Sequence, residues 1–373
     1  MMTKKVIVAG HICLDITPLF PEQKVENIAD FLLPGKSIET KNVDVHTGGA
    51  VANTGLAMKI LGVDVSLMGK VGDDPFGEMV LSILKKYDAD QGMIVAQGEA
   101  TSSSIVLAIP GIDRMFLHNP GANHTFQPED IPEKDLEKAA LFHYGYPSVM
   151  ASMYRNEGSG LVRMMKKVKK AGVATSLDLA VVDENLEAGR EDWNKILKKV
   201  IPYVDFFVPS VEELCFMLDR KLFAQWRERA KGKEITSVLD IENDVKPLAD
   251  LCMSYGAKVL LIKCGATGMY YRTAEKDVLQ QVGTRVELDL EQWADKEGFE
   301  KSFVPECVLS GTGAGDTSIA AFLTAVLEGS SPKEAVSLAA AEGASCVTAF
   351  DALGGIRTLN ELREKIAAGW EKY

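Results

Sequence analysis

The sequence predicts an α/β fold in which a doubly wound, mostly parallel sheet is flanked by helices on both faces. Short apolar segments alternate along the chain with helical segments, which is typical of parallel strands joined by helical crossovers. The first of them, Lys5 to Ala9, is apolar from its second residue onward and is followed by Gly10, as expected of a strand buried on both faces. The 373 residues, 46% hydrophobic and 25% charged, fit one large domain, 1–373, with an appendage.

The predicted elements follow in order along the chain. A helix is predicted from Ala50 to Leu61, where apolar residues recur at helical spacing and a glycine follows the last turn. A strand then runs from Val63 to Met68. The next helix, Pro75 to Tyr87, has Asp74 as its N-cap and a proline in its first turn. The alternation continues with strands at 174–179, 204–208 and 258–263 and helices at 160–171, 191–200, 245–255, 317–327 and 332–349.

Two stretches, 17–47 and 101–125, break this alternation. In the second, Ser103–Ile109 and Arg114–His118 have the composition of strands with no helix between them. We expect a small β-sheet that covers the ligand crevice at the carboxyl ends of the core strands as a lid. Surface insertions are expected at two polar, charged segments, 219–244 and 287–302.

The bulk properties exclude several classes of function. A formal net charge of -12 argues against a protein that holds nucleic acid or an anionic membrane through a general positive field. The six cysteines are scattered without a metal-binding spacing, which favours reduced thiols in a cytoplasm. Apolar runs all fall well short of the roughly 20 residues that cross a bilayer. We therefore expect a soluble, cytoplasmic protein that binds small molecules.

The run Gly313-Ala314-Gly315-Asp316 is the most informative segment. Glycines just before a helix let backbone amides converge at its positive N-terminal end, which makes an anion hole for the γ-phosphate of ATP. A carboxylate at Asp316 would lie beside the acceptor and could take a hydroxyl proton. The alternative is that Asp316 only caps the helix. The run is not a Walker A loop, because no Gly-Lys-Ser/Thr follows it.

A second glycine cluster, Gly48-Gly49, opens the first predicted helix. Glycines there allow the backbone to approach a polyol closely, and Asn53 offers a donor and an acceptor to neighbouring hydroxyls. The alternative places Asn53 in solvent on the first helical turn. The presence of both clusters in one chain favours a binding site over two unrelated turns.

Two stretches, GGAVANTGLAMKILGVDVSLMGKVGDDPFG and GTGAGDTSIAAFLTAVLEG, resemble the two signature stretches of the ribokinase-like (PfkB) carbohydrate kinase family. The likeness extends from Val6 to about Thr358. It implies an α/β core with a β-sheet lid, ATP with Mg²⁺ as phosphoryl donor, and a sugar or similar alcohol as acceptor. It also implies a homodimer formed through the lids.

The resemblance assigns roles to particular residues around the acceptor. Asp316 matches the general base of the family, and Gly313, Ala314 and Gly315 match its anion hole. Asp15, just after the first strand, matches a carboxylate that binds sugar hydroxyls alongside Gly48, Gly49 and Asn53. A turn-capping aspartate is the alternative for Asp15.

The nucleotide side is assigned in the same way. Lys263, at a predicted strand end, falls where the family contacts nucleotide phosphates, although lysines at such positions are often only solvated. Gly265 and Gly268 match glycines of the nucleotide site. Glu213 matches an acid near the metal and phosphates, and its alternative is a first-turn acid that complements a helix dipole.

Departures from the family pattern bear on the cation and the acceptor. Ser310-Gly311 replaces an Asp-Thr pair whose carboxylate is associated with a monovalent cation, which puts K⁺ activation in doubt. The segment His143–Pro147 lacks a carboxylate that ribokinases carry, so ribose is disfavoured. The absence of a basic cluster beside Gly48 and Gly49 disfavours a phosphorylated acceptor.

The sequence thus predicts an ATP-dependent kinase for an unphosphorylated sugar, such as a ketohexose or a sugar acid. One alternative is a nucleoside kinase of the same family, in which Phe116 and Tyr144 contribute to a slot for the base. Another is a sensor that binds sugar or nucleotide without turnover, as the altered Ser310 and Ser210 positions would allow.

Overall fold

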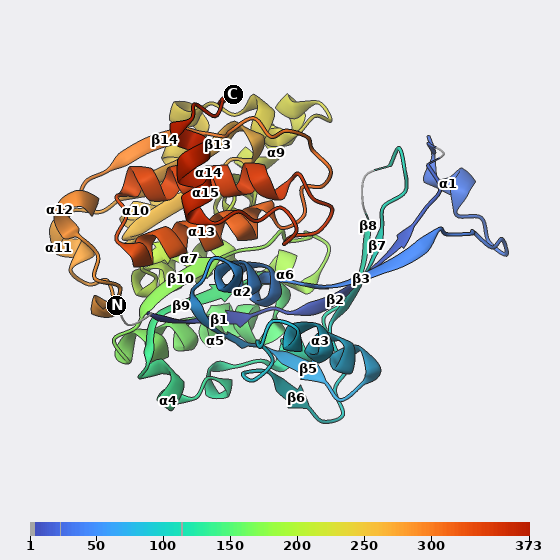
Figure 1. Cartoon of the computed structure of the whole chain (residues 1–373), viewed down its shortest axis with the longest axis horizontal. Coiled ribbons are helices and arrows are strands. Elements are labelled where there is room, and N and C mark those ends of the chain that lie inside the picture. Colours follow the sequence, from blue (N-terminus) through green and yellow to red (C-terminus); the bar gives the residue numbers. More distant parts are fainter. Residues whose placement is uncertain (1–3, 23, 113–114) are drawn as a thin grey trace.

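The main body of the molecule is a large sheet between helical layers (Figure 1). The computed structural model describes residues 4–22, 24–112 and 115–373. Within them the sheet has eight strands, in the spatial order β14 (Glu297–Lys301), β13 (Gly268–Thr273), β12 (Val259–Lys263), β11 (Phe206–Phe207), β10 (Ala174–Asp178), β9 (Ala139–Gly145), β1 (Lys5–Gly10) and β4 (Asp64–Met68). Neighbours from β12 to β4 pair in parallel, and β13 and β14 pair antiparallel at one edge. The predicted mostly parallel sheet is confirmed.

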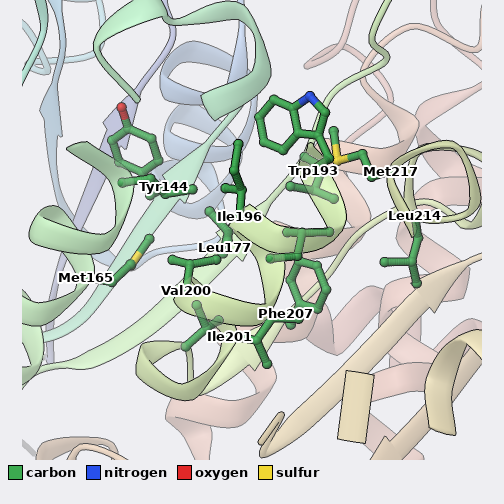
Figure 2. Packing of buried hydrophobic residues seen from close by; sticks show 14 of the residues in the cluster. Tyr144, Met165, Leu177, Trp193, Ile196, Val200, Ile201, Phe207, Leu214 and Met217 are labelled. Atoms are coloured by element: carbon green, nitrogen blue, oxygen red, sulfur yellow. The ribbon is translucent and has the colours of Figure 1, made fainter. Parts of the chain in front are cut away.

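Apolar strands hold the helices on both faces. One face packs against α2 (Ala50–Ile60), α13 (Ala314–Glu328) and α14 (Pro332–Cys346). The other face packs against α5 (Ala151–Lys170), α7 (Trp193–Val200), α8 (Val211–Leu218) and α10 (Lys246–Ser254). Figure 2 shows this second layer, where Trp193 and Ile196 of α7 lie among the same buried residues as Phe207 of β11. Each such buried side chain contributes about 1.5–3 kcal/mol.

A smaller sheet projects from the main body (Figure 1). Its order is β3 (Asn42–Gly48), β2 (Cys13–Leu19), β7 (Ser103–Leu107) and β8 (Met115–Asn119). These strands come from the two stretches predicted to form a lid, except that β2 begins at Cys13, before residue 17. Arg114, at the start of one predicted strand, lies outside the described residues. We refer to these strands as the small sheet.

The remaining helices and strands are shorter or peripheral. They are α1 (Ile28–Phe31), β5 (Lys70–Gly72), α3 (Pro75–Lys85), β6 (Ile94–Ala96), α4 (Glu133–Leu136), α6 (Glu187–Arg190), α9 (Arg220–Ala230), α11 (Lys276–Leu279), α12 (Leu290–Trp293) and α15 (Leu359–Ala367). Within the described ranges, none of the helices has the length and apolar character needed to cross a membrane.

Two segments expected on the surface are partly built into the body. The stretch 287–302 supplies β14, an edge strand whose charged sequence EGFEK gave no strand signal. The stretch 219–244 contains α9, where Trp226 is 1% exposed and its indole donates to Asp244 at 3.0 Å. The burial of Trp226 anchors this segment to the core. The many charged residues around it were the reason that the sequence indicated a surface insertion.

Candidate active site

Asp316 lies in the first turn of α13, behind the glycine turn. Gly313 is the N-cap with φ +78°, and a Cβ there would collide with the Cβ of Ala352. Only glycine therefore combines this left-handed backbone with the close approach. The turn delivers the first amides of α13 and the Asp316 carboxyl to the same end of the helix, and Asp316 is 5% exposed. This is the arrangement that the motif predicted.

The carboxylate of Asp316 is held from two other elements. On α2, Asn53 Nδ2 donates to its Oδ2 at 3.0 Å and Thr54 Oγ1 donates to its Oδ1 at 3.2 Å. From the loop after β9, the Tyr146 hydroxyl lies 2.8 Å from both oxygens. Asn53 is buried, so the alternative of a solvent-facing amide is wrong. These contacts fix the orientation of the carboxylate.

Tyr146 and Thr54 escaped the sequence analysis. Tyr146 is 170 positions from Asp316, so the contact has no local signature. Its position after a buried strand was nevertheless a usable signal, because residues at the carboxyl ends of parallel strands meet at one edge of the sheet.

Asp15 and Gly48 meet at the base of the small sheet. A Cβ on Gly48 would collide with the Asp15 carboxyl, which explains why glycine is needed there. Cys13 Sγ donates to Asp15 Oδ1 at 3.2 Å. Burial raises the pKa of Asp15, while hydrogen bonds from Cys13 and Ser104 act in the opposite direction. Gly49 follows as the N-cap of α2, with φ +86°.

Lys263 and Asp178 form a buried ion pair on the nucleotide side. Lys263 Nζ lies 2.7 Å from Asp178 Oδ1, and the two side chains are 12% and 2% exposed. A Cβ built on Gly315 would be 3.6 Å from this ammonium, so the charge lies beside the glycine turn. The alternative in which Lys263 is only solvated is therefore wrong. Burial acts to lower the pKa of Lys263, but the carboxylates of Asp178, Glu213 and Asp316 outweigh it and raise the pKa. Asp178 was not anticipated from the sequence.

Glu213 takes part in capping α8. Its Oε2 accepts the Ser210 amide at 3.0 Å, and the Ser210 hydroxyl accepts the Glu213 amide at 3.3 Å. This capping box matches the structural alternative for Glu213. Among the described residues no group of three acidic, histidine or cysteine side chains is placed to hold a metal ion.

One cavity of about 660 Å³ joins the Asp316 turn to the nucleotide side, whereas Asp15, Gly48, Gly49 and Asn53 are not among its lining residues. That volume is in the usual range for small-molecule sites. Gly265 and Gly268, both with positive φ, form part of its wall. A Cβ at Gly265 would lie 2.9 Å from Thr236 Oγ1, and one at Gly268 would collide with the Glu300 carbonyl. Its walls include Tyr146, Asp178, Glu213, Lys263, Gly313, Ala314, Gly315 and Asp316.

His46 and Asn123, in or close to the small sheet, both have defined hydrogen-bond partners. Asn123 is fully buried, donates to the Ile12 carbonyl at 2.8 Å and accepts the Ile12 amide at 3.3 Å. It therefore braces the chain between β1 and β2. His46 Nε2 lies 2.7 Å from Asp44 on β3.

Solved structures share the fold of this chain. The chain aligns with a fructokinase with bound ATP from Xylella fastidiosa at 19% identity and a TM-score of 0.70, covering 98% of this chain and 99% of that one. It aligns with Arabidopsis thaliana ribokinase complexed with ribose and ATP at 20% identity and a TM-score of 0.69, covering 97% and 98%. At these identities the comparison establishes the fold, which is that of ribokinases.

Sequence comparison gives the family. The family model described as pfkB family carbohydrate kinase matches residues 4–358, and the chain therefore belongs to this family. Probable fructokinase-2 of Arabidopsis thaliana is 32% identical over 177 residues, or 47% of this chain and 53% of that protein, so the match spans about half of that relative. Probable fructokinase-5 of the same plant is 26% identical over 328 residues, 83% of this chain and 85% of the relative.

Proposed function

We propose that this protein transfers the γ-phosphoryl group of ATP to a hydroxyl of an unphosphorylated sugar or sugar acid, with Asp316 as general base. The observation that supports it best is the placement of Asp316. Its carboxylate is buried, oriented by side chains of α2 and the β9 loop, and located at the amide end of α13 beside Lys263. A proton acceptor and an anion hole at one point are what phosphoryl transfer to an alcohol requires.

The proposed reaction assigns a role to each group. The acceptor hydroxyl gives its proton to Asp316 as its oxygen attacks the γ-phosphorus, and the bond from that phosphorus to the bridging oxygen of ADP breaks. The amides of Gly313, Ala314 and Gly315 stabilise the negative charge on the transferred group. Lys263 adds a positive charge held in place by Asp178.

Magnesium fits this site as an ion that arrives with ATP. Mg²⁺ usually binds through one or two carboxylates together with substrate phosphates, so a preformed cage of protein ligands is not needed. Glu213 and Asp178 supply carboxylate oxygens to the cavity wall, and Glu213 would act indirectly, since it also caps α8. The bound ion would neutralise phosphate charge.

The acceptor side favours neutral hydroxyls. Asp15 accepts hydrogen bonds but repels a phosphate, and the absence of side chains at Gly48 and Gly49 lets Asp15 and His11 lie close to the start of α2. The fructokinase names of the relatives support a ketohexose within this class. The nucleoside alternative has less support, because Tyr144, one of the two residues suggested for its base slot, is completely buried and its hydroxyl contacts Met150 Sδ in the core.

The small sheet is proposed to act as a lid and as a dimer surface. Ile105 and Leu117 are cross-strand partners on β7 and β8 and are 40% and 59% exposed. Val43 on β3 is 47% exposed. Exposed apolar side chains on a projecting sheet suit a second copy of the same chain. Light scattering would distinguish the dimer from a monomer.

A coupled ADP-release assay tests the proposed function. The acceptors are D-fructose, D-ribose, 2-keto-3-deoxygluconate, fructose 6-phosphate and adenosine, each with ATP and Mg²⁺ and again with EDTA. We expect turnover with an unphosphorylated sugar or sugar acid and loss of turnover with EDTA. Preferred turnover of adenosine would establish a nucleoside kinase, and sugar binding without ADP release would establish a sensor.

A further inference from the structure

His11 lies just after β1 and is buried without hydrogen-bond partners for its ring. The residue is 5% exposed, and within the described ranges neither Nδ1 nor Nε2 has a protein partner. Its backbone is fully engaged: the amide donates to the Gly145 carbonyl at 3.2 Å, and the carbonyl accepts the Val51 amide at 3.1 Å. The imidazole is thus held in a fixed place with its polar atoms unpaired, which is costly unless a ligand pairs them.

His11 lies close to three elements: the start of α2, the loop after β9, and β8 of the small sheet. A Cβ on Gly49, the N-cap of α2, would be 2.5 Å from His11 Nδ1. The His11 ring centroid lies 6.0 Å from that of Tyr146, whose hydroxyl contacts Asp316. On the other side it lies 5.5 Å from the ring of His118 on β8 of the small sheet. His11 is therefore located between the proposed base and the predicted lid.

The protonation state of His11 suits a neutral partner. Burial, together with the nearby His118 and His124, lowers its pKa to about 3. The neutral imidazole has one donor and one acceptor nitrogen, the same pair of functions that an alcohol offers. His118 differs, because its Nδ1 already lies 3.0 Å from Ser104 Oγ.

We propose that His11 hydrogen-bonds a hydroxyl of the acceptor sugar and so determines which sugar is accepted. The inference rests on the proposed sugar-kinase function and adds a specificity residue to it. A site with a buried, otherwise unpaired imidazole discriminates strongly in favour of sugars that carry the matching hydroxyl. An analogue without that hydroxyl leaves the polar atoms of the ring without a hydrogen-bond partner.

The test compares His11→Phe with His11→Gln. Phenylalanine keeps an aromatic ring but has no polar atom, whereas glutamine keeps one donor group and one acceptor. With D-fructose as probe we expect His11→Phe to raise the sugar KM by about tenfold or more, with the ATP KM nearly unchanged and partial recovery in His11→Gln. Monodeoxy fructoses identify which hydroxyl contacts His11. The analogue that lacks this hydroxyl should have a raised KM with the wild type, relative to D-fructose, but not with His11→Phe.

Two outcomes would refute the role of His11, and a different one would refute the proposed function. A fructose KM in His11→Phe within about twofold of wild type, or equal penalties for every deoxy analogue in both proteins, would overturn the inference. If the wild type releases no ADP with any acceptor, the proposed function fails instead. The role of His11 is then still measured by the rise in unfolding temperature that D-fructose causes, and an equal rise in wild type and His11→Phe refutes it.

Discussion

The Tyr146 hydroxyl bridges both carboxylate oxygens of Asp316 at 2.8 Å. The backbone of Tyr146 is left-handed, with φ +67° and ψ +48°, a conformation that costs a non-glycine residue about 1–3 kcal/mol. The Tyr146 hydroxyl already occupies hydrogen-bonding positions on the Asp316 carboxylate. An acceptor alcohol that gives its proton to Asp316 must share the carboxylate with this hydroxyl or displace it. Tyr146 is therefore a positioning residue for the proposed base.

Removing this hydroxyl should impair the chemical step more than nucleotide binding. For Tyr146→Phe we expect kcat to fall by about five- to tenfold, since one hydrogen bond to a charged group is lost, while the KM for ATP stays the same. Steady-state ADP release measures both. Tyr144→Phe is the matched control, because its hydroxyl contacts Met150 in the core. Equal losses in the two variants would contradict the role of Tyr146.

The contribution of the Lys263–Asp178 ion pair to stability can be measured separately from its contribution to turnover. Lys263→Met leaves a buried carboxylate unpaired, which should cost about 3–5 kcal/mol of stability in urea unfolding and weaken ATP use. Adding Asp178→Asn should restore most of the stability without restoring turnover. Full recovery of turnover in the double variant would show that Lys263 serves the fold alone.

Glu342 on α14 predicts how stability varies with pH. The side chain is completely buried, and burial raises its pKa from 4.5 to about 8, although the Arg357 amide at 3.3 Å acts to lower it. The folded protein then holds this proton at pH values where the unfolded chain has released it, so the free energy of unfolding falls as pH rises between these two values.

Glu342→Gln should flatten that dependence. The variant should exceed the wild type in stability at pH 8 by about 4 kcal/mol, since each pKa unit is worth about 1.4 kcal/mol, and the advantage should shrink to below about 1 kcal/mol at pH 5. Urea unfolding at pH 5, 6.5 and 8 provides the measurement. The same pH slope in both proteins would mean that Glu342 does not titrate in this window.

Potassium should have little effect on turnover. Ser310 stands where a carboxylate would favour a cation, and its hydroxyl accepts the Thr312 amide at 3.1 Å. The carbonyls of Thr312 and Ala352 lie near the Cys346 thiol, at 3.6 and 3.7 Å. Replacing NaCl with KCl in the ADP assay tests this expectation. Strong activation would reveal a cation site built from other groups.

The sequence predicts what is encoded locally and misses what depends on distant contacts. Gly313 and Asp316 were identified because a glycine turn and the helix after it are adjacent in the chain. Tyr146, Asp178 and His11 were not assigned, because their roles arise only when β9, β10 and β1 end side by side.

The fold shows the same division. The buried parallel strands β1, β4, β10 and β12 were predicted closely from their apolar sequences, whereas the equally buried β9 was missed. The edge strand β14 was missed as well, since its charged residues remain partly in solvent and pairing with β13, rather than burial, fixes it in the sheet. The strand predicted at 204–208 is paired only over Phe206–Phe207. α5 starts at Ala151, but its backbone is non-helical from Arg155 to Gly158, so the continuous helix after this break begins close to the predicted Gly160.

The most direct test of the account is the turnover of Asp316→Asn with the preferred acceptor, measured beside its affinity for sugar and ATP. The amide keeps the size of the side chain but cannot take the proton. We predict a loss of at least about 100-fold in turnover, with both ligands still bound and the unfolding temperature close to that of the wild type. Undiminished turnover in this variant would contradict the assignment of Asp316 as the base.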